Sequence, residues 1–148
     1  MVAIKRILLV EDSARDAELI IDALGAHQLV NAITHVWDGA EALDYLHRRG
    51  TFAGRSDEQP ALLLLDLKLP KVDGLEVLRQ MKGDPVLKVI PVVMMTSSRQ
   101  EQDLISSYQL GVNVYVVKPL KFHDFVEAVK QVGAFWAVIN ALPGVPRP

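Results

Sequence analysis

The chain has 148 residues, half of them hydrophobic, which suits one compact domain and is too short for two of ordinary size. A net charge of −2 with interspersed acids and bases gives no basic face for nucleic acid, and the lack of cysteine excludes disulfides and thiolate metal sites. The longest apolar stretch, residues 132–142, is far below the ~18 residues that span a bilayer, and the apolar start leads into Glu11 and Asp12 rather than a cleavage site. We therefore expect a cytoplasmic protein that binds neither nucleic acid nor membrane.

Hydrophobic patterns predict five strands that alternate with five helices. The strands are expected at residues 4–10, 31–37, 61–65, 91–96 and 114–117. The first helix is expected to end near Gly25, and Ser13 together with Asp16 caps its start. Leu43 and Leu46 mark the buried side of the second helix, and three more helices are expected at about 74–82, 99–110 and 122–142. Asp38–Gly39 reads as a turn and the polar segment 48–60 as a surface loop.

This alternation predicts an α/β fold of the flavodoxin-like kind. Right-handed crossovers place five parallel strands in one sheet with helices on both faces. The order 2-1-3-4-5 is the common solution for five such units. In such sheets ligands bind in the crevice beyond the carboxyl ends of the strands, so residues that follow the strands are candidates for chemistry.

The third predicted strand ends in the most informative residue. Four consecutive leucines, residues 62–65, indicate a strand buried on both faces that delivers Asp66 to the carboxyl edge of the sheet. A lone aspartate at this point would be explained by a turn that follows a core strand. Its interpretation therefore depends on the residues that end the other strands.

Four further polar residues end the neighbouring strands: Glu11 and Asp12 after the first, Thr96 at the fourth and Lys118 after the fifth. Three close carboxylates repel one another unless a hard divalent cation and a cationic side chain compensate them, which predicts a Mg²⁺ site that also accepts Mn²⁺. Lys118 and the Thr96 hydroxyl then suit a phosphate, and Asp66 is the candidate nucleophile that forms an acyl phosphate. Taken singly, the acidic pair could only cap a helix and Thr96 could be an ordinary strand residue.

These residues carry a resemblance to the receiver domains of two-component response regulators, which runs from Lys5 to about Val132. It rests on the acidic pair 11–12, on Asp66 with the following residues 67–74, on Met95-Thr96-Ser97 and on Val117-Lys118-Pro119. Five positions spread over the chain must coincide for such a match, which makes the motif set specific.

The resemblance implies the role of each site residue. Asp66 would be the phosphoacceptor of a phosphorelay, and a sensor histidine kinase or phosphotransfer protein would be the donor. Glu11, Asp12, Asp66 and the backbone carbonyl of Lys68 would bind Mg²⁺. Thr96, Lys118 and Tyr115 would sense the phosphoryl group, although a tyrosine that only packs is the alternative for Tyr115. The Lys118–Pro119 peptide bond would be cis.

Two features narrow the resemblance to single-domain regulators that serve phytochrome-type histidine kinases. One is the long loop 48–60 and the other is the C-terminal segment that contains Phe135 and Trp136. We expect one receiver domain over residues 1–148, with a core at about 4–132 and an extension at about 133–148. With no output domain expected on this chain, the signal would leave by binding another protein.

The last predicted helix carries apolar residues on two sides beyond Val132, and one helix cannot bury both against one sheet. We expect a homodimer through this helix and the fifth strand, with an interface of Phe125, Val129, Phe135, Trp136 and Ile139. The alternative is that the extension folds back onto its own domain by a bend at Gly133.

Two other classes of function compete with the switch. A Mg²⁺-dependent phosphatase or phosphotransferase with an aspartyl-phosphate intermediate usually has a second aspartate two residues after the nucleophile, and this chain has Lys68 there. A pseudo-receiver that only binds partners would not need the intact acidic pair, Asp66, Thr96 and Lys118. The four histidines lie on different predicted elements, which argues against a histidine metal site.

Overall fold

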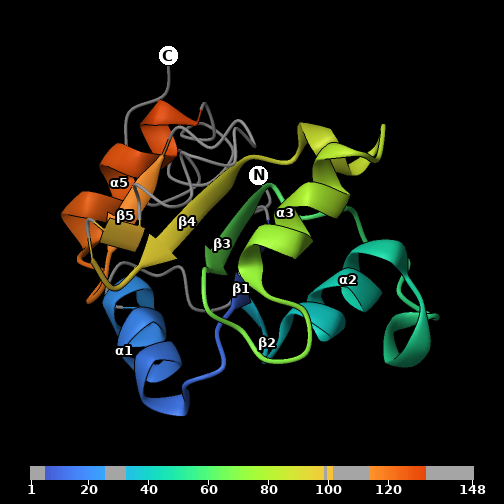
Figure 1. The fold of residues 1–148 in the computed structure, drawn as a ribbon, viewed down its shortest axis with the longest axis horizontal. Coiled ribbons are helices and arrows are strands. Elements are labelled where there is room, and N and C mark those ends of the chain that lie inside the picture. Colours follow the sequence, from blue (N-terminus) through green and yellow to red (C-terminus); the bar gives the residue numbers. More distant parts are fainter. Residues whose placement is uncertain (1–5, 26–32, 99, 102–113, 133–148) are drawn as a thin grey trace.

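The computed structural model describes residues 6–25, 33–98, 100–101 and 114–132, which form an α/β domain (Figure 1). Its strands are β1 (Ile7–Val10), β2 (Ile33–Val36), β3 (Leu62–Asp66), β4 (Val92–Thr96) and β5 (Tyr115–Val117). Its helices are α1 (Ala14–Gly25), α2 (Gly39–His47), α3 (Gly74–Lys82) and α5 (Phe122–Gln131), with short 3₁₀ turns η2 (Gly50–Phe52) and η3 (Leu87–Val89). The predicted helix at about 99–110 lies almost wholly outside the described residues.

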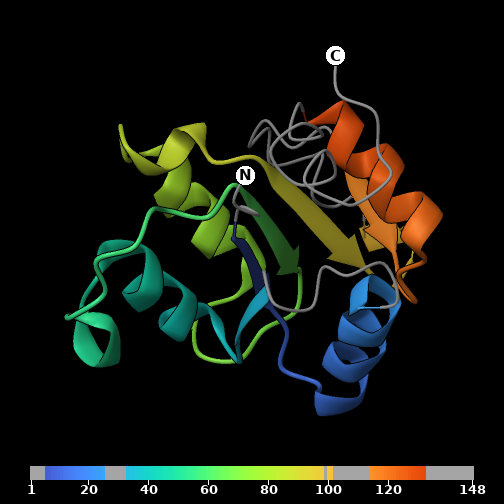
Figure 2. The ribbon, with the colours of Figure 1, turned by 180° about the vertical axis from the view of Figure 1, so that it is seen from behind.

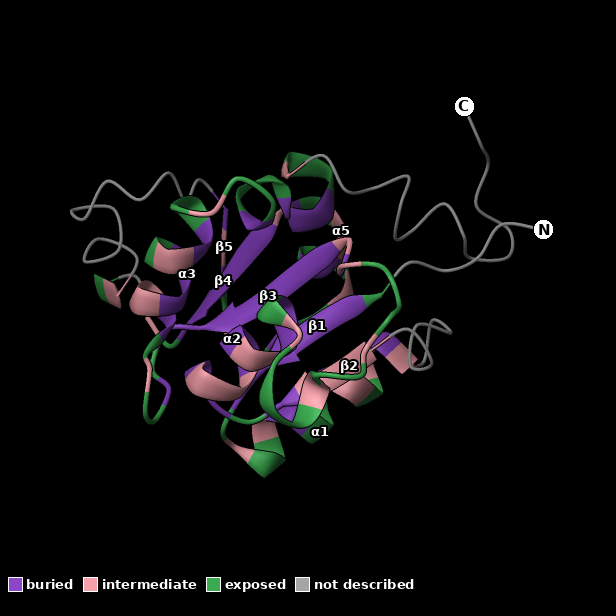
Figure 3. Cartoon of the chain, turned by 90° about the vertical axis from the view of Figure 1, so that its right-hand side faces the viewer, coloured by how far each residue is buried: buried purple, intermediate pink, exposed green. Residues whose placement is uncertain are grey.

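All five strands pair in parallel in the order β2-β1-β3-β4-β5, so the predicted fold class and strand order are confirmed. Helices α1 and α5 cover one face of the sheet and α2 and α3 the other, as the front and back views show (Figures 1 and 2). The central strand β3 is buried throughout (Figure 3). Leu62 and Leu64 pack towards α1 and α5, and Leu63 and Leu65 pack towards α2 and α3. Burial on both faces explains why this strand is apolar without alternation.

Side-chain caps fix where three helices begin. Ser13 Oγ accepts from the backbone N–H of Asp16 at 3.1 Å, which confirms the predicted cap of α1. Asp73 caps α3 in the same way through the N–H of Glu76 at 2.9 Å. Asp38 accepts from the N–H of Glu41 at 2.8 Å, so it is the N-cap of α2 and Gly39 is the first helical residue. The prediction of a turn at Asp38–Gly39 is therefore wrong, because the aspartate oxygen satisfies a free N–H of the first helical turn.

The segment 48–60 lies on the surface, as predicted, and is tied to the end of α2. The guanidinium of Arg55 lies 3.9 Å from the centre of the Tyr45 ring and donates to the Tyr45 carbonyl oxygen at 2.9 and 3.1 Å. Gln59 Nε2 donates to the carbonyl oxygen of Leu46 at 2.7 Å. These bonds tie the loop to carbonyl groups in the last turn of α2.

Helix α5 ends at Gln131 with Val132 as its C-cap, so the prediction of one helix continuing to about residue 142 is wrong at Val132. The next residue is Gly133, and glycine is disfavoured inside a helix and favoured just after its end. Residues 133–148 lie outside the described part of the chain, and with them Phe135, Trp136 and Ile139.

Two residues of the predicted dimer interface lie in the core of the protomer. Phe125 and Val129 are both 0% exposed and belong to the core between α5 and the sheet. A side chain with no exposed surface in the protomer has none to offer a second copy, so both must be removed from the predicted interface.

Within the described ranges, no helix combines the length and apolar character that a membrane crossing requires.

Candidate functional site

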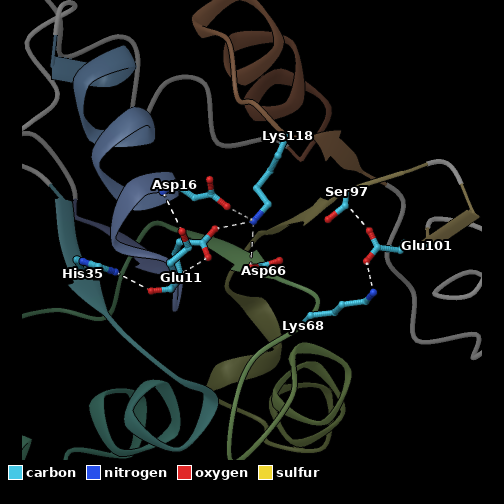
Figure 4. A network of polar contacts seen from close by, with 9 residues as sticks. Glu11, Asp16, His35, Asp66, Lys68, Ser97, Glu101 and Lys118 are labelled. Carbon is cyan, nitrogen blue, oxygen red and sulfur yellow. Dashed lines mark hydrogen bonds and ion pairs between the residues drawn. The ribbon is translucent and has the colours of Figure 1, made fainter.

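Four strands bring the predicted site residues to one edge of the sheet (Figure 4). Asp66 is the last residue of β3 rather than the first one after it, and it pairs with Met95 of β4. Glu11 follows β1, Thr96 ends β4 and Lys118 follows β5. Glu11 and Thr96 are fully buried and Asp66 is 6% exposed. The carboxyl edge therefore holds a buried polar cluster above an apolar core.

The three predicted metal-binding carboxylates come together. Glu11, Asp12 and Asp66 each offer one oxygen, and these oxygens lie within 4.8 Å of one another. Hard oxygen ligands at such spacing fit a Mg²⁺ or Mn²⁺ ion. The side chain of Lys68 points away from this cluster, with its Nζ 3.5 Å from Glu101 Oε1, so only its backbone carbonyl remains a candidate ligand.

Lys118 is the cation that faces these acids. Its Nζ lies 2.9 Å from Glu11 Oε1, 2.9 Å from Asp16 Oδ2 and 3.2 Å from Asp66 Oδ2. Burial lowers the pKa of Lys118, but the hydrogen bonds to Glu11 and Asp16 and the charge of Asp66 outweigh burial and raise the pKa overall. The predicted cis bond between Lys118 and Pro119 is confirmed.

The acids are not fully compensated by this one cation. Burial raises the pKa of Asp66 to about 7, and the neighbouring Glu11 carboxylate adds to the rise, while Lys118 opposes it. The pKa of Asp12 is also raised, first by burial and then by the charge of Glu11. A bound divalent cation would relieve this repulsion, so the electrostatics as well as the donor atoms fit a metal.

The hydroxyl of Thr96 is the one buried side-chain polar atom without a hydrogen-bond partner in the part of the chain that the structure describes. A buried hydroxyl without a partner loses its hydration and gains nothing in return. The atom is thus available to a ligand oxygen that would reach the carboxyl edge.

We expect Thr96→Val to raise the free energy of unfolding by about 1 kcal/mol in metal-free buffer, because valine keeps the shape and removes the unpaired hydroxyl. Urea unfolding measures the change. Thr51→Val, at an exposed position in η2, serves as the control and should leave stability nearly unchanged. A destabilised Thr96→Val protein would show that the hydroxyl already has a partner.

Tyr115 lies in β5, half-buried against the core that packs beneath α2 and α3. This position is compatible with both readings of Tyr115, so its role as a switch residue stays a prediction.

Three residues near the site were not anticipated. The sequence predicts only a capping role for Asp16 at the start of α1, yet its carboxylate reaches Lys118. His35 Nε2 donates to the backbone carbonyl oxygen of Glu11 at 2.8 Å. Glu101 accepts from the N–H of Ser97 and contacts Lys68 (Figure 4). In the sequence these three residues are recognisable only as polar positions, because their partners lie on other elements.

The chain is similar in sequence and fold to several response regulators. The chain is 40% identical to the response regulator Rcp1 of Synechocystis sp. over 139 residues, which is 94% of this chain and 93% of that protein. The bacteriophytochrome response regulator AtBRR has a TM-score of 0.88 at 55% identity, with coverage of 94% of this chain and 99% of that one. The Mn²⁺-bound form of Rcp1 has a TM-score of 0.70 at 40% identity, with coverage of 97% and 99%. The phosphorylated cyanobacterial phytochrome response regulator RcpA has a TM-score of 0.73 at 43% identity, with coverage of 96% and 100%.

The family model of the response regulator receiver domain matches residues 7–130. This range includes the acidic cluster, Thr96 and Lys118, and it spans every described strand and every described helix except the last residue of α5. The chain therefore belongs to the response regulator receiver domain family.

Proposed function

We propose that the chain is a phosphorylation switch in which Asp66 accepts a phosphoryl group from the phosphohistidine of a sensor kinase or a phosphotransfer protein. Receiver domains are signalling switches rather than conventional enzymes, and histidine kinases or phosphotransfer proteins are their partners. The observation that carries the assignment is the buried Asp66 carboxylate, 3.2 Å from Lys118 and grouped with Glu11 and Asp12.

Receiver domains bind Mg²⁺ or Mn²⁺ at an acidic pocket. We assign this ion to the carboxylates of Glu11, Asp12 and Asp66 and to the backbone carbonyl of Lys68. Its chemical contribution would be to neutralise negative charge on the phosphoryl oxygens and the attacking carboxylate.

The protein's own groups supply the remaining chemistry. An Asp66 carboxylate oxygen forms the new O–P bond while the N–P bond of phosphohistidine breaks and the imidazole nitrogen leaves with its electron pair. The ammonium of Lys118 stabilises charge on a phosphoryl oxygen, and the unpaired Thr96 hydroxyl donates to another. Because Asp66 must be ionised to attack, the burial that raises the pKa of its carboxyl group to about 7 opposes the reaction, and a bound divalent cation would favour the ionised form.

The relatives suggest a donor. AtBRR is described as a bacteriophytochrome response regulator and RcpA as a phytochrome response regulator. We propose a phytochrome-type histidine kinase as the phosphodonor of this chain. The proposal includes a cytoplasmic location and a single receiver domain with its core at about 4–132. A homodimer through the last helix and β5 stays a prediction, now without Phe125 and Val129.

Incubation with acetyl phosphate and Mg²⁺, followed by intact mass spectrometry, tests the proposal. We expect the mass of one phosphoryl group to be added per chain, and peptide mapping to place it on Asp66. Omission of Mg²⁺ should suppress labelling. Sustained turnover of acetyl phosphate would indicate an enzyme, and no labelling would indicate a pseudo-receiver.

A further inference from the structure

We propose that Asp16 is a positioning residue that holds the ammonium of Lys118 in place when Glu11 and Asp66 bind the divalent cation. The inference rests on the proposed function and assigns a task to a residue outside the predicted metal and phosphate sites. Lys118 has three carboxylate partners, and Asp16 is the one among them that the acidic cluster does not include.

The three N–H groups of the Lys118 ammonium match three acceptors (Figure 4). Glu11 and Asp66 are both buried and both belong to the cluster suited to a metal. When these two carboxylates bind a cation, their attraction for the Lys118 ammonium becomes weaker. Asp16, 2.9 Å from Lys118 Nζ, keeps its full interaction and becomes the principal anchor of the ammonium.

A closed ring of hydrogen bonds fixes the position of Asp16. Glu11 contacts Lys118 through Oε1, and its Oε2 accepts from the N–H of Ser13 at 3.2 Å. Ser13 Oγ in turn accepts from the N–H of Asp16 at 3.1 Å, and Asp16 Oδ2 returns to Lys118. The first turn of α1 is therefore tied to the Lys118 ammonium through backbone groups as well as through the Asp16 carboxylate.

The surroundings of Asp16 suit a permanent anchor. Asp16 and Lys118 line a cavity of about 420 Å³ between α1 and the segment after β5, and Ser97 lines the same cavity. The Asp16 side chain is 37% exposed, so it stays hydrated and does not bear the desolvation cost of the fully buried Glu11. The freed N–H groups of Lys118 can then turn to a phosphoryl oxygen while Asp16 holds the nitrogen.

Nuclear magnetic resonance of the lysine ammonium group tests the anchor without any phosphoryl transfer. In protein with ¹⁵N-labelled lysine, we expect a Lys118 ammonium signal that is protected from water exchange and that survives addition of Mg²⁺. In Asp16→Asn the signal should persist without metal, because Glu11 and Asp66 remain, and should be lost when Mg²⁺ is added. Lys118→Met assigns the signal.

Glu18→Gln is the matched control, because it removes the same charge from an exposed position on the same helix. It should behave like the wild-type chain in both conditions. A Lys118 signal that survives Mg²⁺ in Asp16→Asn would overturn the proposal, as would its loss in Glu18→Gln.

Phosphorylation kinetics give the second readout. At saturating Mg²⁺ we expect Asp16→Asn to slow labelling by acetyl phosphate roughly 10- to 100-fold, because the ammonium is no longer held where charge develops. The Mg²⁺ concentration for half-maximal rate should change much less, since Asp16 is not a metal ligand. Asp16→Glu, which keeps a carboxylate, should recover part of the rate.

The outcomes separate this inference from the proposed function. If the wild-type chain and Glu18→Gln are labelled and Asp16→Asn is labelled at the same rate, the role of Asp16 is wrong and the switch stands. If the wild-type chain itself is not labelled, both are wrong.

Discussion

Asp66→Asn is expected to abolish phosphoryl acceptance and to make the metal-free protein more stable by about 2 kcal/mol at pH 8. The change removes the nucleophilic carboxylate with little change in volume. It also removes a charge that burial and Glu11 disfavour, since these raise the pKa of Asp66 to about 7. Lys118 keeps its contacts with Glu11 and Asp16.

The stability gain should depend on pH in a defined direction. The pKa of Asp66 is higher in the folded chain than its ordinary value of 3.8, so the folded state binds more protons between these two values. This carboxyl group therefore lowers the free energy of unfolding as the pH rises from about 4 to about 7, and the loss is complete above 7. Asp66→Asn lacks this contribution.

Urea unfolding of both proteins in the presence of a chelator, at pH 4.5 and pH 8, measures the difference. The two proteins should be closest in stability at pH 4.5 and furthest apart at pH 8. Asp22→Asn, at an exposed position on α1, controls for the loss of one negative charge. A pH-independent difference, or full labelling of Asp66→Asn by a phosphorylated kinase, would contradict the assignment of Asp66.

Gly74→Ala is expected to lower the free energy of unfolding by about 3 kcal/mol and to slow phosphorylation. A Cβ atom at Gly74 would lie 2.3 Å from the carbonyl oxygen of Asp66 and 2.9 Å from that of Leu67. Both are backbone atoms that cannot turn aside, so the end of β3 must shift. The hydrogen bond from the N–H of Gly74 to the Leu67 carbonyl oxygen, 2.9 Å long, would be strained by the same shift.

Gly83→Ala gives the matched control at the other end of α3. A Cβ atom there would meet its nearest neighbour at 3.6 Å, and the φ angle of −84° suits any residue. Alanine should therefore be neutral or should stabilise by up to about 1 kcal/mol, through a less flexible unfolded chain. Equal stability of the two variants in chemical denaturation would show that the end of β3 adapts without cost.

The sequence predicted those parts of the site that follow from strand topology. Glu11, Asp66 and Lys118 meet because parallel strands end at one edge, and a buried strand such as residues 62–65 is visible in its composition. The contact between Asp16 and Lys118 joins positions 102 residues apart and depends on side-chain direction, for which no pattern exists. In the sequence, the capping pattern at the start of α1 accounts for Asp16 and gives no sign of its second partner, Lys118.

The errors in the last helix have a different origin. Apolar residues at helical spacing indicate that a face is buried, but not what buries it. The pattern predicts that Phe125 and Val129 contact a second copy, whereas the core of the same chain buries them completely. After Gln131 the sequence carries two opposing signals: Gly133 disfavours a helix, and the apolar pattern that continues beyond it favours one. The structure ends α5 at Gln131.

The surface loop 48–60 leads into the amino end of β3, whereas Asp66 is at its carboxyl end. The length of a central strand therefore separates this loop from the acidic cluster. Gly54 is exposed in the loop, and a Cβ atom there would have no neighbour within 4 Å. Because the chain contains no cysteine, Gly54→Cys would create a single thiol to which a fluorophore could be attached, at a distance from the chemistry it would report.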